Sequence, residues 1–408
     1  MTGRASGGNL LRYALWGLVF SLLCYAILRV GAGAVAGRSN SDAVLRIAPD
    51  NALALVSAST RATEALAPER LDEAAELARR AYVREPVSSG ALRQLGLIAA
   101  AKGREDAARQ LLQQSERLSQ RDFLAQVLLI EDAVGREDVA AALHHYDVAL
   151  RTSKRAASIL FDPLTFATTD AAMIKPLAKL LVMQPPWGNF FLLHAASTSA
   201  SPRNVANLMT LLLRSKYQVA PLAIQSLVGR LVQDKDYESA WLLFSALEPA
   251  ARRDSLRDPR FQNASASGLP FDWSFDISGS GTGMLVDDAQ GSRLAFAAPV
   301  GTGGVVARQL LLLRPGRYRL STIVTGNNAG PGSSPVWRLR CIDEARDLAT
   351  LSLPVVQNQE ERVSREVNVA GCSAQWLELA LTATDDSEGI AGAVTSVNIE
   401  RVDQGGKS

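Results

Sequence analysis

Residues 103–108 read Gly-Arg-Glu-Asp-Ala-Ala and residues 135–140 read Gly-Arg-Glu-Asp-Val-Ala, so one short stretch recurs 32 residues further on. A looser form, Lys-Asp-Tyr-Glu-Ser-Ala, occupies residues 235–240, and Arg-Leu-Asp-Glu-Ala-Ala occupies residues 70–75. A period of about 30 to 35 residues marks stacked units, none of which buries its apolar face alone. We therefore expect a helical repeat domain, flanked by different structures on both sides.

The repeated stretch also carries the apolar spacing of helices. Val139, Leu143, Tyr146 and Ala149 recur with the offsets of a single helix face. Between such helices we expect a second set, at residues 91–102, 122–134 and 217–233.

This pattern resembles the tetratricopeptide repeat (TPR) family, whose unit is a 34-residue helix-turn-helix with small residues at fixed places. The resemblance covers about residues 50–249 and is weakest at 153–201, where prolines interrupt it. It implies a solenoid of helical hairpins with a groove for protein partners. The alternative is an irregular helical bundle.

Length and composition limit the kind of protein that this chain forms. At 408 residues it is too long for one hydrophobic core, so we expect two or three domains. The net charge of +2 gives no reason to expect a nucleic-acid partner. His144 and His145 are adjacent, and neighbouring side chains on a helix point about 100° apart, so we expect no metal site there. We expect no cofactor either.

The N-terminus predicts attachment to a membrane. Residues 13–28 carry no charge, and with the small residues that follow Arg29 the apolar span is long enough to cross a bilayer. We expect a single-pass signal anchor at residues 1–38. A signal peptide cleaved near the Ala-Gly-Ala of residues 32–34 is the alternative.

After Pro249 the sequence changes to glycine and β-forming residues. We expect a helical domain at 41–255, a linker at 256–269, an antiparallel β-sandwich at 270–403 and a disordered tail at 404–408. The expected strands are 271–277, 293–297, 304–313, 317–325, 336–342, 349–356, 362–369, 374–384 and 394–402.

The period-two pattern of these strands predicts which aromatic residues face the core. Trp273, Trp337 and Tyr318 fall on apolar faces and are predicted to be buried. Trp376 alternates with Leu377 and its neighbouring leucines, which places it beside Glu378 on the other face. Three interpretations of Trp376 are open. Its ring stacks on a sugar, it packs in an interface, or it is a core residue that the period-two pattern assigns to the wrong face of the strand. Trp376 and Glu378 are therefore our candidate ligand or interface residues.

The order of strands, the segment 310–320 (Leu-Leu-Leu-Leu-Arg-Pro-Gly-Arg-Tyr-Arg-Leu) and the closing strand at 392–402 resemble jelly-roll carbohydrate-binding modules. The resemblance implies a sugar-binding or accessory role and transfers no particular binding residue.

Cys341 and Cys372 are the two cysteines of this domain. Outside the cytoplasm they form a candidate disulfide, and a loop of that size adds about 3 kcal/mol of stability. The alternative is a pair of reduced thiols in a cytoplasmic sandwich.

The sequence contains neither a Gly-x-Ser-x-Gly elbow nor a His-Glu-x-x-His motif, so we expect no catalytic residues and a non-enzymatic protein. The alternative is a glycan-active enzyme, since glycosidases use two carboxylates about 5 to 10 Å apart. Acidic pairs in the expected sandwich loops are Asp287-Asp288, Asp343-Glu344 and Asp385-Asp386.

Together these features predict a multidomain α + β chain: an N-terminal membrane helix, an α-solenoid of helical hairpins and a jelly-roll head. We expect an envelope scaffold or adaptor in the bacterial inner membrane, with most of the chain in the periplasm. Its groove binds proteins and its head binds a polysaccharide or a protein, in the setting of exopolysaccharide synthesis or export. A third reading is a purely structural module whose sandwich binds no sugar.

Overall fold

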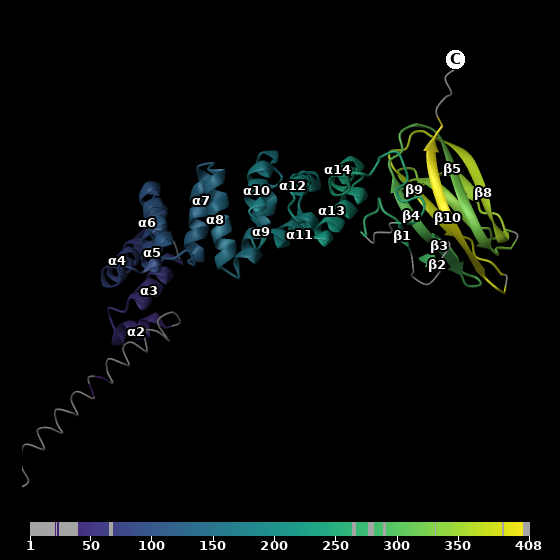
Figure 1. The fold of residues 1–408 in the computed structure, drawn as a ribbon. Helices are drawn as coiled ribbons and strands as arrows, with labels where there is room; N and C mark the ends of the chain where they lie inside the picture. Colours follow the sequence, from purple (N-terminus) through teal and green to yellow (C-terminus); the bar gives the residue numbers. More distant parts are fainter. Residues whose placement is uncertain are drawn as a thin grey trace, which may run out of the picture. The chain divides into compact units, whose positions relative to one another are not determined.

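The computed structural model describes residues 21, 23, 40–64, 68–262, 267–275, 281–288, 291–330, 332–385 and 387–402 (Figure 1). The expected anchor at 1–38, apart from Ser21 and Leu23, and the expected tail at 404–408 lie outside these residues. Within the described ranges, no helix combines the length and the apolar character that crossing a membrane requires. Thirteen α-helices come first in these ranges, followed by two antiparallel sheets.

The chain divides into two compact units, with the boundary inside one helix. The first unit runs to Asp162 and includes Pro185–Trp187; the second contains Pro163–Gln184 and the chain from Gly188 onward. The domain bounds expected from the sequence, 41–255, 256–269 and 270–403, stay predictions.

The first unit consists of helical hairpins. Its helices are α2 (Ser41–Ile47), α3 (Ala52–Glu64), α4 (Pro68–Arg84), α5 (Ser89–Ala101), α6 (Glu105–Leu118), α7 (Phe123–Gly135), α8 (Val139–Thr152) and the start of α9 (Ala156–Ala167). Helix α3 packs on α4, α5 on α6 and α7 on α8, and each pair contacts the next. Small residues allow this packing: a Cβ added to Gly96 of α5 would lie 2.8 Å from Leu112 Cγ of α6.

The turns within the hairpins explain the repeated sequence. Gly103 (φ 69°) precedes the residue that caps α6, and Glu137 (φ 57°) precedes the residue that caps α8. The structural repeat therefore aligns Gly103 with Glu137, whereas the letter match aligned Gly103 with Gly135. Helix α8 begins 34 residues after α6, the length of the expected unit.

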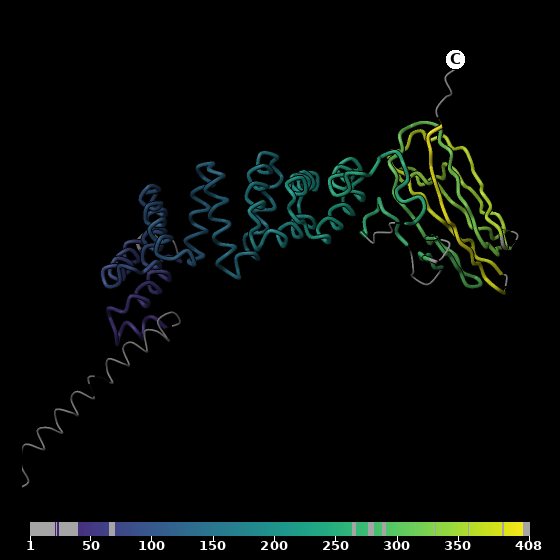
Figure 2. The backbone as a smooth tube through the Cα atoms, viewed as in Figure 1, coloured from purple at the N-terminus to yellow at the C-terminus, as the bar shows by residue number. Residues whose placement is uncertain are grey.

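The helices of the second unit pack in another way. They are the 3₁₀ turn η1 (Ala171–Met173), α10 (Ile174–Val182), α11 (Gly188–Thr198), α12 (Pro202–Arg214), α13 (Pro221–Gln233) and α14 (Tyr237–Leu247). Alternate helices are in contact here: α10 packs on α12, α11 on α13 and α12 on α14. The backbone trace shows α11 to α14 side by side (Figure 2). The expected helices are confirmed, and a solenoid of hairpins over the whole helical region stays a prediction. Proline does not end the helix in the region where the repeat pattern is weakest, because Pro163 lies inside α9.

The sandwich consists of two five-stranded antiparallel sheets among the described residues. Sheet A has the order β1-β4-β9-β6-β7, and sheet B has the order β2-β3-β10-β5-β8. The strands are β1 (Ser274–Phe275), β2 (Thr282–Asp288), β3 (Gly291–Ala298), β4 (Gly304–Leu311), β5 (Gly316–Asn327), β6 (Val336–Cys341), β7 (Asp347–Ser352), β8 (Val356–Val369), β9 (Gln375–Leu381) and β10 (Ile390–Arg401). The sequence prediction missed β2, which pairs with β3.

The core between the sheets contains the aromatic residues that the period-two pattern assigned to it. Trp337 and Tyr318 are fully buried, and Trp273 is 7% exposed. The Trp337 indole N–H donates to Thr322 Oγ1 at 3.3 Å, which satisfies the one polar atom of this ring.

Described residues of the stretch expected as a linker, 256–269, pack on the sandwich. Leu256 and Phe261 belong to its hydrophobic core. Phe271, which follows, lies outside that core and packs on α14, with ring centroids 5.3 Å from Trp241 and 4.9 Å from Phe244. The aromatic contacts explain why α14 and the sandwich belong to one compact unit.

Candidate functional site

The outer face of sheet A carries the two candidate residues. In β9, Leu377 and Leu379 are fully buried in the core. Because side chains alternate along a strand, Trp376 and Glu378 lie on the opposite face, as the sequence predicted. Trp376 is half-buried there, and Glu378 is 8% exposed.

Strand pairing places arginines on both sides of these residues. Arg308 of β4 and Arg338 of β6 are the register partners of Glu378. Trp376 is paired with Leu310 of β4 and Arg340 of β6. We call Arg308, Arg338, Arg340, Trp376 and Glu378 the sheet A patch.

The contacts within the sheet A patch hold it together. The guanidinium carbon of Arg308 lies 4.9 Å from the centroid of the Trp376 ring, a cation–π contact. Arg338 lies 3.9 Å from Glu378, at the outer limit of an ion pair. The Nε atom of Arg338 is buried and has no hydrogen-bond partner among the described residues. The patch therefore contains one buried donor without a hydrogen-bond partner among the described residues.

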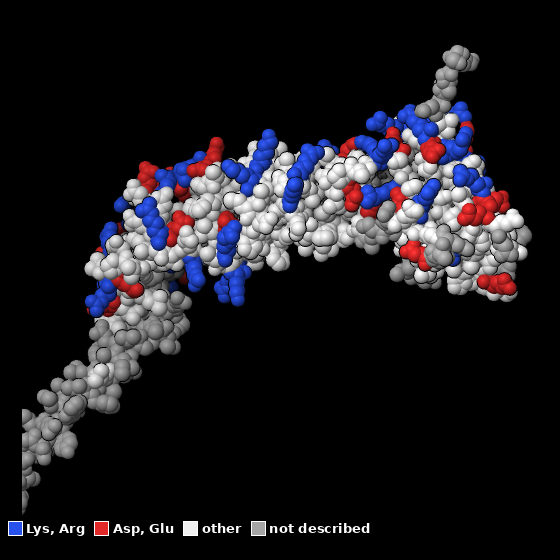
Figure 3. Space-filling model, viewed as in Figure 1, with Lys and Arg blue, Asp and Glu red and all other residues white. Residues whose placement is uncertain are grey.

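The balance of charge on the sheet A patch is positive. Three guanidinium groups face one carboxylate, Glu378, and Asp347 adds a second carboxylate at the edge strand, where it pairs with Arg340. Elsewhere basic and acidic side chains are interspersed over the face drawn in Figure 3. A planar guanidinium binds a carboxylate, sulfate or phosphate with two parallel hydrogen bonds, and an indole ring offers an apolar stacking surface.

A hollow borders the sheet A patch on one side, and a buried region borders it on the other. On one side, Ser274, Phe275, Val305 and Ala307 line a hollow of about 220 Å³ with Arg308. On the other side Leu310 is buried, in a region lined also by Trp241 and Phe244 of α14. Helix α14 thus lies near Leu310, while Trp376 on the next strand keeps part of its surface exposed.

The two cysteines of the sandwich form a disulfide that lies at the end of β6. The Cys341–Cys372 bridge joins Cα atoms 5.8 Å apart. In the turn that follows β6, Asp343 accepts hydrogen bonds from the Tyr237 hydroxyl of α14 and from the backbone N–H of Ser373, both at 3.2 Å. Burial, and then the Asp343 carboxylate, raise the pKa of Tyr237 to about 12.

Two of the residues in the expected acidic pairs, Asp287 and Asp343, have partners outside the sheet A patch. Asp287 accepts a hydrogen bond from Ser292 across the β2–β3 hairpin, and Asp343 is engaged as above. The side chains of Asp288 and Asp386 lie outside the described residues.

Two of the other concave surfaces among the described residues bear on function. One is a groove of about 730 Å³ in the first unit, lined by residues of α3, of α5 and of the turn that leads into α7; among them are Val56, Thr60, Arg93, Asp122 and Phe123. The other, of about 300 Å³, lies over sheet B and includes Arg260, Arg293 and Glu360 but no aromatic residue.

The three arginines of the sheet A patch were missed by the sequence analysis. Arg338 and Arg340 alternate with the buried Trp337 and Leu339, so their outward direction was readable. Their position beside Trp376 was not, because the pairing of β6 with β9 joins residues far apart in the chain.

Comparison with known proteins gives partial likenesses. No family model matches the chain, and no characterised protein sequence matches it. Membership of the TPR family therefore stays a prediction. The helical region and the antiparallel sandwich are observed directly in the structure and do not depend on these comparisons.

Solved structures match about a third of the chain. A carbohydrate-binding module, TmCBM61 in complex with β-1,4-galactotriose, is 13% identical over 37% of this chain and all of its own, with a TM-score of 0.27. The CBM22-1 xylan-binding domain of Paenibacillus barcinonensis Xyn10C is 14% identical over 38% of this chain and 97% of its own, with a TM-score of 0.25. Tailspike protein 4 of bacteriophage CBA120 is 13% identical over 37% of this chain but only 22% of its own, with a TM-score of 0.27. These likenesses carry no argument about ligand or activity.

Proposed function

We propose that the sheet A patch binds an anionic glycan, one whose sugars carry carboxylate or other acidic groups. The observation that carries the proposal is the position of the half-buried Trp376 among Arg308 and Arg340, with Arg338 beside Glu378. An aromatic ring is a stacking platform for the apolar face of a sugar, and the guanidinium groups are donors for its acidic substituents.

The free energies of the two kinds of contact favour a ligand that both stacks on Trp376 and accepts hydrogen bonds from the arginines. A hydrogen bond to a charged group contributes about 1.5–3 kcal/mol, and an aromatic contact contributes about 0.5–1.5 kcal/mol beyond its buried area. Arg308 already covers part of the Trp376 ring, so a neutral sugar has to displace it. An acidic sugar instead gives the displaced guanidinium a new partner.

We also propose that the groove of the first unit binds a segment of a partner protein, which gives the chain a scaffold or adaptor role. The groove is lined by the first helices of successive hairpins, α3 and α5, and by the start of α7. It combines apolar Val56 and Phe123 with Arg93, whose Nε is buried without a hydrogen-bond partner among the described residues. Grooves of helical repeats commonly bind extended segments.

The proposed location is the bacterial inner membrane, with a single anchor and most of the chain in the periplasm. The uncharged stretch 13–28 supports the anchor. The Cys341–Cys372 disulfide supports an oxidising compartment. In this setting, binding of an acidic polysaccharide fits a role in exopolysaccharide synthesis or export.

We propose that the protein binds its glycan without cleaving it. Glycosidases place two carboxylates on opposite sides of one glycosidic bond. On the sheet A patch, Glu378 is surrounded by Arg308 and Arg338 as register partners, an environment suited to holding charge. Release of reducing ends from any bound polysaccharide would overturn this part.

The test is a glycan array probed with the full chain in detergent. We expect signals on uronic-acid-containing glycans that exceed those on neutral glycans. Trp376→Ala should abolish them, while the matched control Arg293→Ala, on sheet B, should retain them. Equal binding by the wild-type chain and Trp376→Ala, or binding to neutral glycans alone, would refute the proposal.

A further inference from the structure

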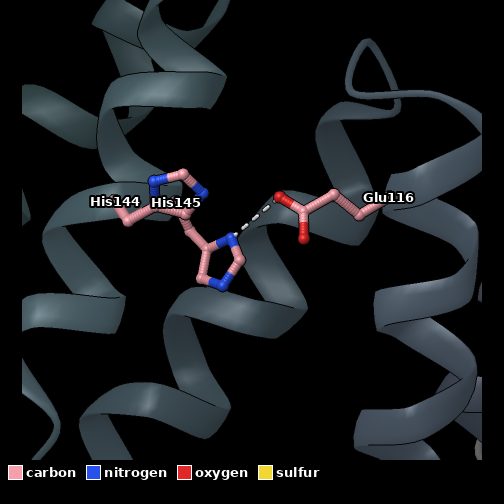
Figure 4. A group of neighbouring side chains, drawn as sticks. All are labelled: Glu116, His144 and His145. Carbon is pink, nitrogen blue, oxygen red and sulfur yellow. Dashed lines mark ion pairs between the residues drawn. The ribbon is translucent and has the colours of Figure 1, made fainter.

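A second cluster of side chains lies in the first unit, away from the sandwich. Glu116 is in the last turn of α6, and His144 and His145 are adjacent in α8. One ligand atom of each, a carboxylate oxygen or a ring nitrogen, lies within 4.8 Å of the other two. Figure 4 shows Glu116 and the two imidazoles facing a common point between the helices.

Adjacent histidines on one helix point in different directions, so we expected no metal site from the sequence alone. The structure adds a third group from another helix. Glu116 Oε1 lies 3.2 Å from His145 Nδ1. In a tetrahedral zinc site with bonds of about 2.0–2.1 Å, neighbouring ligand atoms are about 3.3 Å apart, so this pair already has the required spacing.

The side chains of the three residues differ in how far they can move. The side chains of His145 and Glu116 are only 11% and 15% exposed, so their positions are fixed by packing. His144 is exposed, so its ring can rotate about its side-chain torsions to close the remaining distance.

Gln126 of α7 supports the arrangement. Its side-chain N–H donates to Glu116 Oε1 at 3.1 Å, and its amide oxygen lies 3.0 Å from His145 Nδ1. Hydrogen bonds of this kind orient a ligating carboxylate.

We propose that Glu116, His144 and His145 bind one divalent transition-metal ion of the zinc class and thereby tie α6 to α8. Two imidazole nitrogens and one carboxylate oxygen are a zinc-type ligand set, and a water or the Gln126 amide oxygen completes the shell.

The test is calorimetric titration of zinc chloride into the full chain in detergent, with thermal unfolding followed in parallel. We expect one ion per chain, a dissociation constant in about the micromolar range and a higher unfolding temperature with zinc. His144→Gln should weaken binding at least about tenfold and remove the shift, because it deletes a ligand without disturbing the buried pair. His194→Gln, a histidine outside the cluster, is the matched control and should behave as wild type.

Cobalt substitution gives a readout independent of stability. A tetrahedral cobalt spectrum in the wild-type chain that is absent from both His144→Gln and Glu116→Gln supports the site. The proposal is overturned if zinc does not bind, or if it binds equally well to wild type and His144→Gln. Either result would mean that Glu116, Gln126 and His145 form a hydrogen-bond network only.

Discussion

The guanidinium carbon of Arg308 lies 4.9 Å from the centre of the Trp376 ring, and the two residues come from neighbouring strands of sheet A. In this contact the positively charged guanidinium covers part of the ring face on which a sugar would stack. Mutation of Arg308 should therefore change the binding of acidic and of neutral sugars in different ways.

Replacing Arg308 with alanine uncovers the Trp376 ring and removes one cation. We expect binding of an oligouronate to weaken by about tenfold or more, the effect of losing one hydrogen bond to a charged group. Binding of the carboxyl-reduced, neutral form should stay equal or improve. Fluorescence titration with both sugars measures this, and a parallel loss for both would contradict the assigned role.

Arg338→Gln shortens the side chain and removes its charge but leaves a polar amide. We expect weaker oligouronate binding, and a wild-type affinity that falls more steeply with added salt than that of the variant. Affinities measured at two salt concentrations give the comparison, with Arg293→Gln on sheet B as control. An unchanged salt dependence in Arg338→Gln would remove this residue from the binding surface.

The disulfide is expected to stabilise the sandwich. Replacing Cys341 and Cys372 with serine should lower the free energy of unfolding of the second unit by about 3 kcal/mol, the value for a loop of this size. Near-ultraviolet circular dichroism, which reports the packing around Trp337, follows the denaturant transition. Reducing agent should shift the wild type to the same midpoint and leave the double variant unmoved. A variant as stable as the oxidised wild type would contradict the prediction.

The hydrogen bond from Tyr237 to Asp343 gives a dependence on alkaline pH. Because the pKa of Tyr237 is raised to about 12 in the folded protein, its contribution to stability is complete below about pH 10 and is lost as the pH rises through 12. Tyr237→Phe should cost about 1 kcal/mol at neutral pH, and the gap from wild type should narrow between about pH 10 and pH 12. A constant gap across this range, measured by urea unfolding, would show that Tyr237 does not titrate in this way.

Two helix glycines test the close packing of the hairpins. Gly96→Ala should destabilise the first unit by about 1–3 kcal/mol, since the added Cβ would lie 2.8 Å from Leu112 Cγ. Gly229→Ala in α13 meets no atom within 4 Å and should stabilise its helix by up to about 1 kcal/mol. Thermal unfolding of both variants measures the contrast, and equal shifts would contradict the packing.

The parts of the fold that depend on local periodicity could be predicted from the sequence. The helices that begin at Glu105 and Val139, and the buried faces of Trp337 and Tyr318, follow from spacings of 3.6 and 2 residues. The short strand β2 was missed because its neighbours in sequence include glycines, and its partner β3 supplies the pairing that defines it.

The features that depend on contacts between distant segments could not be predicted. Trp376 and Glu378 were placed on the correct face, but pairing of β9 with both β4 and β6 was needed to bring the arginines beside them. The cluster of His144, His145 and Glu116 likewise depends on the packing of α8 near α6. Neither pairing leaves a signal in the spacing of residues along the chain.

The measurement closest to the central claim is the affinity of the full chain for a hexameric oligouronate and for its carboxyl-reduced counterpart, by calorimetry. We expect the acidic form to bind at least tenfold more tightly, a difference of about 1.4 kcal/mol, and Trp376→Ala to lose that binding. Equal affinity for both sugars, or an unchanged affinity in Trp376→Ala, would contradict it.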